Sequence, residues 1–191
     1  AMARFAEQQE RFRGMEITAT PRRVYPEGAT GAHLVGYVGK ADLPAAVKRD
    51  YDFLLPEWAG RAGLERQFDA ALAGRAGRRL VRVDASGFMA GVVRETASEP
   101  GRDLVLTLDL QIQKLAERAL AGERGAVVIL DPRNGDVLAM ASAPGFDPNL
   151  FVAGDSAAVE GLLRAENDPL FNRAVRMAIP PGSVFKIITA A

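Results

Sequence analysis

The sequence predicts an α+β fold in two modules that meet near Pro100-Gly101. Residues 110–121 repeat apolar side chains at helical spacing, which indicates an amphipathic helix. Residues 126–141 hold two short apolar runs separated by Asn134-Gly135, the strongest short-range hairpin signal. Residues 78–96 hold a second pair of strand-like runs. The presence of helices and hairpins in one chain is what gives the mixed class.

The first module combines short helices with short strands. Residues 32–38 form an apolar run that fits a strand or a short helix. Pro21 permits only an edge strand or a bulge beside it. The expected elements are a charged helix over 3–13, strand-like segments over 16–20 and 22–25, helices over 43–55 and 64–72 (the second ended by Gly74), and strands over 78–83 and 89–96 around the turn Asp84-Ala85-Ser86-Gly87.

The second module has stronger signals. A strand is expected over 104–108, and Asp109 is placed to cap the helix that follows. Gly122 is expected to end that helix. Its apolar residues are expected to form one core-facing stripe: Ile112, Leu115, Ala116, Ala119 and Leu120. Strands are expected over 126–130 and 137–141, and both of their faces are expected to be covered in the intact domain because the apolar runs show little alternation. Residues 147–176 are loop-rich, with one short helix around 157–165.

Composition excludes several classes of function. Lys plus Arg and Asp plus Glu both number 24, so long-range attraction of nucleic acid has no support. The absence of cysteine excludes disulfides and thiolate metal sites, and it agrees with an oxidising compartment. No apolar run approaches the roughly 20 residues that span a bilayer. The aspartates lack metal-loop spacing and are interpreted as turn formers or caps: Asp84, Asp103, Asp109, Asp131 and Asp136.

The most informative motif is Pro-Gly-Ser-Val-Phe-Lys, residues 181–186. Positions i and i+3 of a helix are neighbours, so a helix that begins near Ser183 brings the Lys186 amine within reach of the Ser183 hydroxyl. A serine needs a base before it attacks a carbonyl. A lysine serves as that base only if its pKa falls from about 10.4 to around 7–8. A bare match favours an N-cap serine with a solvated lysine, and the flanking sequence reverses that order. Neither a cofactor nor a metal is expected.

The flanking motifs run in a fixed order along nearly the whole chain. They are Arg-Val-Tyr-Pro (23–26), Ala-His-Leu-Val-Gly-Tyr-Val-Gly (32–39), Gly-Arg-Ala-Gly-Leu-Glu (60–65), Gly-Ala-Val-Val-Ile-Leu-Asp-Pro (125–132), Asn-Gly-Asp-Val-Leu-Ala-Met-Ala-Ser (134–142), Phe-Asp-Pro-Asn-Leu-Phe (146–151), Pro-Leu-Phe-Asn-Arg-Ala (169–174) and Pro-Pro-Gly-Ser (180–183). This series, with Ser-x-x-Lys, resembles class B penicillin-binding proteins of the elongation type. The resemblance implies a mixed, dimerisation-type pedestal module over residues 1–101. It also implies an incomplete transpeptidase domain over residues 102–191, which holds a helix and the β-hairpin of its central sheet.

The resemblance also implies roles for the site residues. Ser183 would attack the penultimate D-alanine carbonyl of a peptidoglycan stem peptide, with Lys186 as the base, and an amine of a neighbouring stem would resolve the acyl-enzyme. β-Lactams would acylate the same serine. The family's Ser-x-Asn and Lys-Thr/Ser-Gly motifs occur at none of the serines or lysines of this chain. The 191-residue chain itself is therefore expected to be inactive, with Lys186 solvated and protonated.

A second interpretation is a non-catalytic pedestal that binds other proteins. The resemblance implies contacts with the glycan polymerase and scaffold proteins of the cell-elongation complex, and an inner-membrane anchor that places the protein on the periplasmic face. Ala1-Met2 is typical of an engineered start, so the anchor is expected to lie outside this otherwise soluble piece. The hairpin over 126–141 is expected to have open edges, which predicts a homodimer or partial disorder after about Ala143.

Other conspicuous residues have structural interpretations. His33, the single histidine, is expected to be structural, because a catalytic histidine requires a nearby nucleophile and an orienting acid. Glu65 is expected to form a buried ion pair with Arg61 or a backbone contact. Four arginines are expected to line a solvated hairpin edge: Arg75, Arg78, Arg79 and Arg82.

Overall fold

The structure is a computed structural model that describes residues 22–41, 58–85 and 89–190. The chain divides into two compact units, one joining Ala1–Arg23 to Ala70–Asp103 and the other joining Val24–Asp69 to Leu104–Ala191. The second unit therefore combines segments from both sides of the expected joint, and the domain boundary at residues 101/102 stays a prediction. The helices expected over 3–13 and 43–55 and the strand over 16–20 lie outside the described residues.

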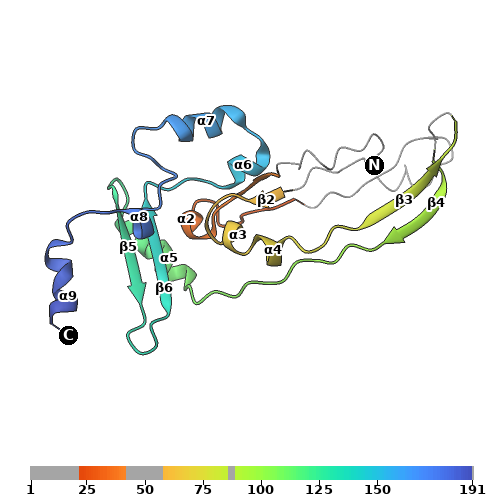
Figure 1. Cartoon of the computed structure of the whole chain (residues 1–191). Helices are drawn as coiled ribbons and strands as arrows, with labels where there is room; N and C mark the ends of the chain where they lie inside the picture. Colours follow the sequence, from red (N-terminus) through yellow and green to blue (C-terminus); the bar gives the residue numbers. More distant parts are fainter. Residues whose placement is uncertain (1–21, 42–57, 86–88, 191) are drawn as a thin grey trace. The chain divides into compact units, whose positions relative to one another are not determined.

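The described part of the first unit is an antiparallel hairpin of β3 (Arg78–Val83) and β4 (Met89–Thr96), as the sequence predicts (Figure 1). Every residue of β3 is exposed. Arg79 pairs with Glu95 across the strands at 2.9 Å, and Arg75 pairs with Glu99 at 3.6 Å. These exposed ion pairs agree with the interpretation of the arginines as a solvated hairpin edge.

The second unit begins with a small layer of short elements. They are α2 (Ala32–Val35), β1 (Val38–Lys40), β2 (Trp58–Gly60), α3 (Gly63–Gln67) and α4 (Asp69–Leu72), which crosses into the first unit. Strands β1 and β2 pair antiparallel. Helix α2 decides the ambiguous run 32–38 for its first four residues, and Gly36, at φ 83°, ends that helix. Tyr25, Val38 and Val152 form the buried cluster of this layer.

In this layer one local prediction is wrong, and a second is confirmed except at one residue. Residues 22–25 form no strand, because the Tyr25 N–H and carbonyl bond the side-chain amide of Asn149 rather than a neighbouring strand. The helix expected over 64–72 is interrupted at Phe68, whose φ/ψ of −111°/21° is not helical. The Asp69 carboxylate accepts from the Gly60 N–H at 2.7 Å, which holds the start of α4 against β2.

The remaining core of the second unit is a helix packed on a hairpin. Helix α5 (Leu110–Ala119) packs on β6 (Val137–Ala143), which pairs antiparallel with β5 (Gly125–Leu130) (Figure 1). Ala116, Ala139 and Ala141 form the buried centre of this contact. Asp109 caps the helix as predicted, because its carboxylate accepts from the backbone N–H groups of Gln111 and Ile112. The hairpin and helix predictions are confirmed here.

Contacts at the edge of β6 that faces away from β5 account for two differences from the prediction: the residues that α5 buries, and the absence of a strand over 104–108. The buried Gln113 side chain bonds both the N–H and the carbonyl of Met140. Gln113 therefore faces β6, and Ile112, Ala116 and Leu120 pack against the hairpin as predicted. The rest of the predicted stripe is wrong, since Leu115 and Ala119 are exposed.

The strand expected over 104–108 is also wrong. Residues 104–108 have no strand assignment, and Thr107 Oγ1 donates to the Val137 carbonyl of β6. Asp109 N–H similarly donates to the Leu138 carbonyl. The β6 edge that the sequence predicts to be open is therefore partly covered by residues 107–113.

Short helices follow the hairpin. Helix α7 (Ser156–Arg164) confirms the predicted helix, whereas α6 (Asn149–Ala153) and α8 (Arg173–Arg176) were not predicted within this loop-rich region. Helix α8 packs on β5 and β6. The described chain ends with the 3₁₀ turn η3 (Gly182–Phe185) and α9 (Lys186–Thr189). Among the described residues, no helix has the length and apolar character needed to span a bilayer.

Candidate active site

Ser183 and Lys186 lie on consecutive helical turns. Ser183 is in η3 and Lys186 opens α9, so the helix expected to begin near Ser183 is present. Helical spacing keeps the two residues on one side of this segment. Both residues are exposed, and in the described part of the chain no hydrogen bond joins the Ser183 hydroxyl to the Lys186 amine. The structure therefore places both residues on one side of a single helical segment, and their catalytic roles stay a prediction.

The segment that carries Ser183 leaves from a firmly held loop and helix. Asn172 caps α8, because its side-chain oxygen accepts from the Ala174 N–H at 3.1 Å. Arg173, 5% exposed, donates from its guanidinium to the carbonyls of Asn167, Asp168 and Phe171. A buried guanidinium with three carbonyl acceptors closes the loop 167–171 onto the start of α8.

Ser142 ties this loop to the hairpin. Its hydroxyl donates to the Phe171 carbonyl at 3.3 Å and accepts from the Arg173 N–H at 2.9 Å. Ser142 alternates with Ala141 along β6, so its side chain is on the face opposite the α5 contact. The loop and α8 are thus fixed to one face of the hairpin while α5 occupies the other.

His33 reaches the same loop from α2. Its Nε2 lies 2.7 Å from the Pro169 carbonyl oxygen, and its own carbonyl accepts from the Asn172 side-chain amide at 3.2 Å. The ring packs edge-on against Phe146, with centroids 5.1 Å apart. Burial lowers the pKa of His33, and the nearby Arg173 adds to this, whereas the Pro169 hydrogen bond and Glu117 act in the opposite direction. The structural role expected for His33 agrees with these contacts.

A pH-dependent stability follows from the lowered His33 pKa. Because the folded chain binds this proton less readily, the unfolded chain holds more protons between the folded pKa and about 6.5. The His33 contribution is therefore complete above about pH 7.5 and is lost as the pH falls through 6.5 toward the folded pKa. Urea unfolding between about pH 5.5 and 8, above the range where most carboxylates titrate, should show this slope.

The variant His33→Gln tests that assignment, since the chain has one histidine. It should remove most of the slope, whereas Arg164→Gln, which alters an exposed ion pair with Glu160 on α7, should keep it. An undiminished slope in His33→Gln would show that another group causes it.

A second buried set joins Tyr25 to Glu65. Glu65 is 5% exposed and accepts from the Tyr25 hydroxyl at 3.3 Å, and that hydroxyl accepts from the Val38 N–H at 3.1 Å. The sequence did not predict Tyr25 as a partner of Glu65. In the same unit, Tyr37 stacks on Phe151 with ring centroids 3.7 Å apart.

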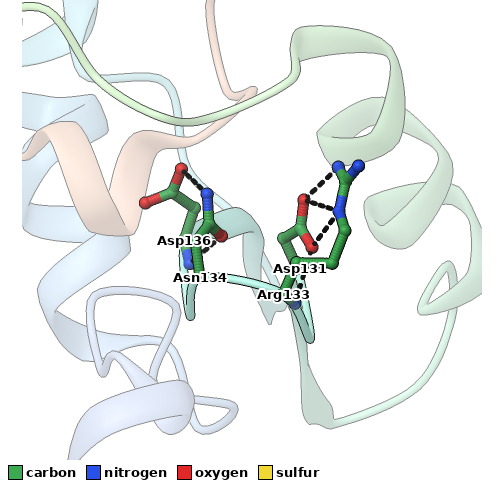
Figure 2. Close-up of polar contacts among 4 residues, drawn as sticks. All are labelled: Asp131, Arg133, Asn134 and Asp136. Atoms are coloured by element: carbon green, nitrogen blue, oxygen red, sulfur yellow. Dashed lines mark hydrogen bonds and ion pairs between the residues drawn. The ribbon is translucent and has the colours of Figure 1, made fainter.

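The tip of the β5–β6 hairpin is a closed network of turn residues (Figure 2). Asp131 accepts from the backbone and the guanidinium of Arg133, which lowers the pKa of the Asp131 carboxyl. Asn134 and Asp136 bond each other. Gly135 takes φ 80°, the left-handed conformation that favours glycine, within the loop 131–136 that joins the two strands. Asp131 and Asp136 are therefore turn formers, as expected, and across the described residues no group of three acidic or histidine side chains is arranged to hold a metal.

The sequence and the structure differ in which residues they single out. The motif identifies Ser183 and Lys186, whereas the structure adds a hydrogen-bonded group before them. It consists of the buried Ser142 and Arg173 and the half-buried His33 and Asn172. Asn172 ahead of a short helical run is a recognisable cap signal. No sequence signal pairs His33 with a loop 136 residues away.

Comparison with known proteins finds the same kind of protein in both parts of the chain. The model of the penicillin-binding protein dimerisation domain matches residues 1–106, and that of the penicillin-binding protein transpeptidase domain matches residues 125–191. The peptidoglycan D,D-transpeptidase MrdA of Escherichia coli K12 is 41% identical over 97% of this chain and 30% of its own length. MrdA of Acinetobacter baumannii is 38% identical over 99% of this chain and 28% of its own length.

Solved structures give the same result. The complex of PBP2 with MreC from Helicobacter pylori matches with a TM-score of 0.73 and 30% identity, over 97% of this chain and 34% of that one. Pseudomonas aeruginosa PBP2 in complex with WCK 5153 matches with a TM-score of 0.66 and 36% identity, over 92% of this chain and 35% of that one. This chain spans about a third of the length of these relatives. With a dimerisation-domain match over more than half of its residues, the chain belongs to the penicillin-binding proteins and, within them, to the group of penicillin-binding protein 2.

Proposed function

We propose that this chain carries the nucleophile of a peptidoglycan D,D-transpeptidase that cross-links the cell wall during elongation. The observation that carries the proposal is the Ser183-x-x-Lys186 pair on one side of a helical segment, within the stretch that matches the transpeptidase model. Relatives named peptidoglycan D,D-transpeptidase support the reaction class.

The proposed reaction proceeds through two acyl transfers. A neutral Lys186 amine takes the proton of the Ser183 hydroxyl, and the oxygen attacks the carbonyl of the penultimate D-alanine. The peptide bond to the terminal D-alanine breaks, and that residue leaves with the proton from Lys186. An amine of a second stem then attacks the serine ester, forms the cross-link and returns the proton to Ser183. A β-lactam follows the first half, because its ring amide opens onto the same oxygen.

The 191 residues contain only part of this site in the proposal. An oxyanion requires backbone donors, and the family's Ser-x-Asn and Lys-Thr/Ser-Gly motifs are not in this sequence. Ser183 and Lys186 are both exposed, so nothing among the described residues excludes water from them. We therefore propose that this chain alone is inactive and that a longer protein supplies the remaining groups.

Mass spectrometry after treatment with penicillin tests both parts of the proposal. In a complete protein with sequence beyond residue 191, a penicilloyl adduct should map to the peptide that contains Ser183. The 191-residue chain should gain no mass under the same conditions. An adduct on another residue of the complete protein would overturn the assignment of Ser183, and a stable adduct on the short chain would overturn its predicted inactivity.

A second candidate function is a protein-binding pedestal of the cell-elongation complex. It is favoured by the dimerisation-domain match over residues 1–106 and by the likeness to PBP2 solved in complex with MreC. Exposed apolar side chains on the β3–β4 hairpin, including Leu80, Val83 and Val93, offer a surface for such contacts. The coding sequence after residue 191 discriminates the two: Ser-x-Asn followed by Lys-Thr-Gly supports the enzyme, and a natural stop supports the module.

The proposed substrate also sets the proposed location. Stem peptides of peptidoglycan lie outside the inner membrane, so we place the site on the periplasmic face, on a protein held by an N-terminal anchor. Protease treatment of spheroplasts tests this placement, since a periplasmic domain should be degraded while the membrane stays intact.

A further inference from the structure

A chain of contacts runs from α2 to the segment that carries Ser183. His33 and Asn172 are 139 residues apart in sequence, and they are joined by the bond from the Asn172 amide to the His33 carbonyl. The His33 ring adds the contact with the Pro169 carbonyl. His33 therefore bonds both ends of the stretch 169–172, through its ring at Pro169 and through its carbonyl at Asn172.

The direction of the ring bond fixes the His33 tautomer. A carbonyl oxygen only accepts, so His33 Nε2 carries the hydrogen and donates it to Pro169. The edge-on contact with Phe146 and the bond at the His33 carbonyl restrict the ring and backbone from two other sides. His33 is thus a fixed donor rather than a solvent-exposed side chain that meets the loop by chance.

Helix α2 is itself anchored to α5 beside this contact. The Gly31 N–H donates to the Glu117 carboxylate at 2.7 Å, and Lys114 pairs with Glu27 at 2.6 Å. Both partners lie on α5, the helix that packs against β6. The His33 contact therefore ties the loop to a rigid part of the unit.

The loop in turn determines where the Ser183 segment begins. Asn172 starts α8, and α8 packs on the hairpin, so movement of Asn172 shifts the helix from which residues 177–181 leave. Pro180 and Pro181 have φ fixed near −65°, which makes the last step before Gly182 stiff. A displacement at Asn172 reaches Ser183 through residues 177–181, which are all exposed and whose restrained members are Pro180 and Pro181.

We propose that His33 is a positioning residue for acylation of Ser183. It acts through Pro169 and Asn172, which hold the loop and α8 in the orientation that presents the serine. This inference rests on the proposed function, because it assumes that Ser183 is the acylated atom. His33 does not touch the substrate, so the expected effect is on the rate of acylation and not on the binding of the β-lactam.

The test measures acylation of the complete protein by a fluorescent penicillin, separating the first-order acylation step from the initial binding constant. His33→Leu removes the donor to Pro169, whereas His33→Gln keeps an N–H donor at a similar reach. Asn172→Asp keeps the cap on α8 and loses the donor to the His33 carbonyl. Arg164→Gln on α7 is the matched surface control. Thermal unfolding of each variant identifies those that fold.

The expected results separate positioning from stability. His33→Leu and Asn172→Asp should slow the acylation step about tenfold or more, as misplacement of a reacting group does, with little change in binding. His33→Gln should recover to within about threefold of the unaltered protein, and Arg164→Gln should match it. The double variant His33→Leu/Asn172→Asp should be little slower than the slower single variant, because both changes release the same loop.

Failure of this inference is distinguishable from failure of the proposed function. If Ser183→Ala still becomes labelled, the proposed function fails whatever the His33 variants do. If labelling requires Ser183 but Asn172→Asp and folded His33→Leu acylate at the normal rate, only the positioning role is overturned. If His33→Leu does not fold, the comparison of His33→Gln with Asn172→Asp decides, and equal, undiminished rates in both overturn the role.

Discussion

Alanine at position 183 is expected to abolish covalent labelling of the complete protein by a fluorescent penicillin. The methyl group has no oxygen to attack the β-lactam carbonyl, so no acyl-enzyme forms, however well the ligand binds. Lys186→Arg is expected to slow labelling by about 10²–10⁴-fold, because a guanidinium keeps the positive charge but does not act as a base at neutral pH. The pair of variants therefore separates the nucleophile from its base.

Labelling is read by in-gel fluorescence over time, with Ser98→Ala as the matched serine control. Ser98 is exposed in the first unit, and its loss should leave the rate unchanged. Full labelling of Ser183→Ala would mean that another residue is acylated and would overturn the proposed function. Normal labelling of Lys186→Arg would leave Ser183 as the nucleophile but assign the base elsewhere.

Gly36→Ala is expected to destabilise the second unit by about 4 kcal/mol, which is at the upper end for a single substitution. Gly36 has φ 83° and ψ −157°, a backbone conformation that is essentially restricted to glycine. A Cβ at this position would also overlap the Ala62 carbonyl and lie 2.8 Å from the Gly63 nitrogen. These neighbours are backbone atoms, so the end of α2 and the start of α3 must separate to make room.

Gly28→Ala is the matched control, because Gly28 also has a positive φ, 56°, but a Cβ there meets nothing within 4 Å. It should cost only about 1 kcal/mol of backbone strain. Urea unfolding followed by fluorescence reports on this region, since the single tryptophan, Trp58, packs against the Tyr25 cluster. Equal unfolding midpoints for the two variants would show that the close backbone approach is not what Gly36 provides.

Elements governed by neighbouring residues were predictable from the sequence. Asp109 before an apolar helical run gives the cap and helix α5, and Asn134-Gly135 gives the β5–β6 hairpin, because caps and tight turns depend on a few adjacent residues. The strand expected over 22–25 failed for the opposite reason. The backbone of Tyr25 is satisfied by a side chain 124 residues away, and local pattern contains no information about that partner.

The candidate site likewise combines residues that local sequence identifies with contacts that depend on distant partners. Ser183 and Lys186 are recognisable because their chemistry depends on a fixed spacing of three residues. The contacts of His33 depend on the tertiary arrangement of α2 and the loop before α8, and a lone histidine in an apolar run favours a structural interpretation. Leu115 illustrates the limit for packing: its helical spacing fits the core stripe, but Gln113 bonds the edge of β6 and turns Leu115 outward.

The discontinuous second unit has a consequence for synthesis on the ribosome. Tyr25 and His33 emerge 124 and 136 residues before their partners Asn149 and Pro169. At bacterial elongation rates of about 5–20 residues per second, this interval lasts roughly 6–30 s. During that time the nascent segment that carries Tyr25 and His33 lacks these partners, so its contacts are completed only after residues 149–169 are translated.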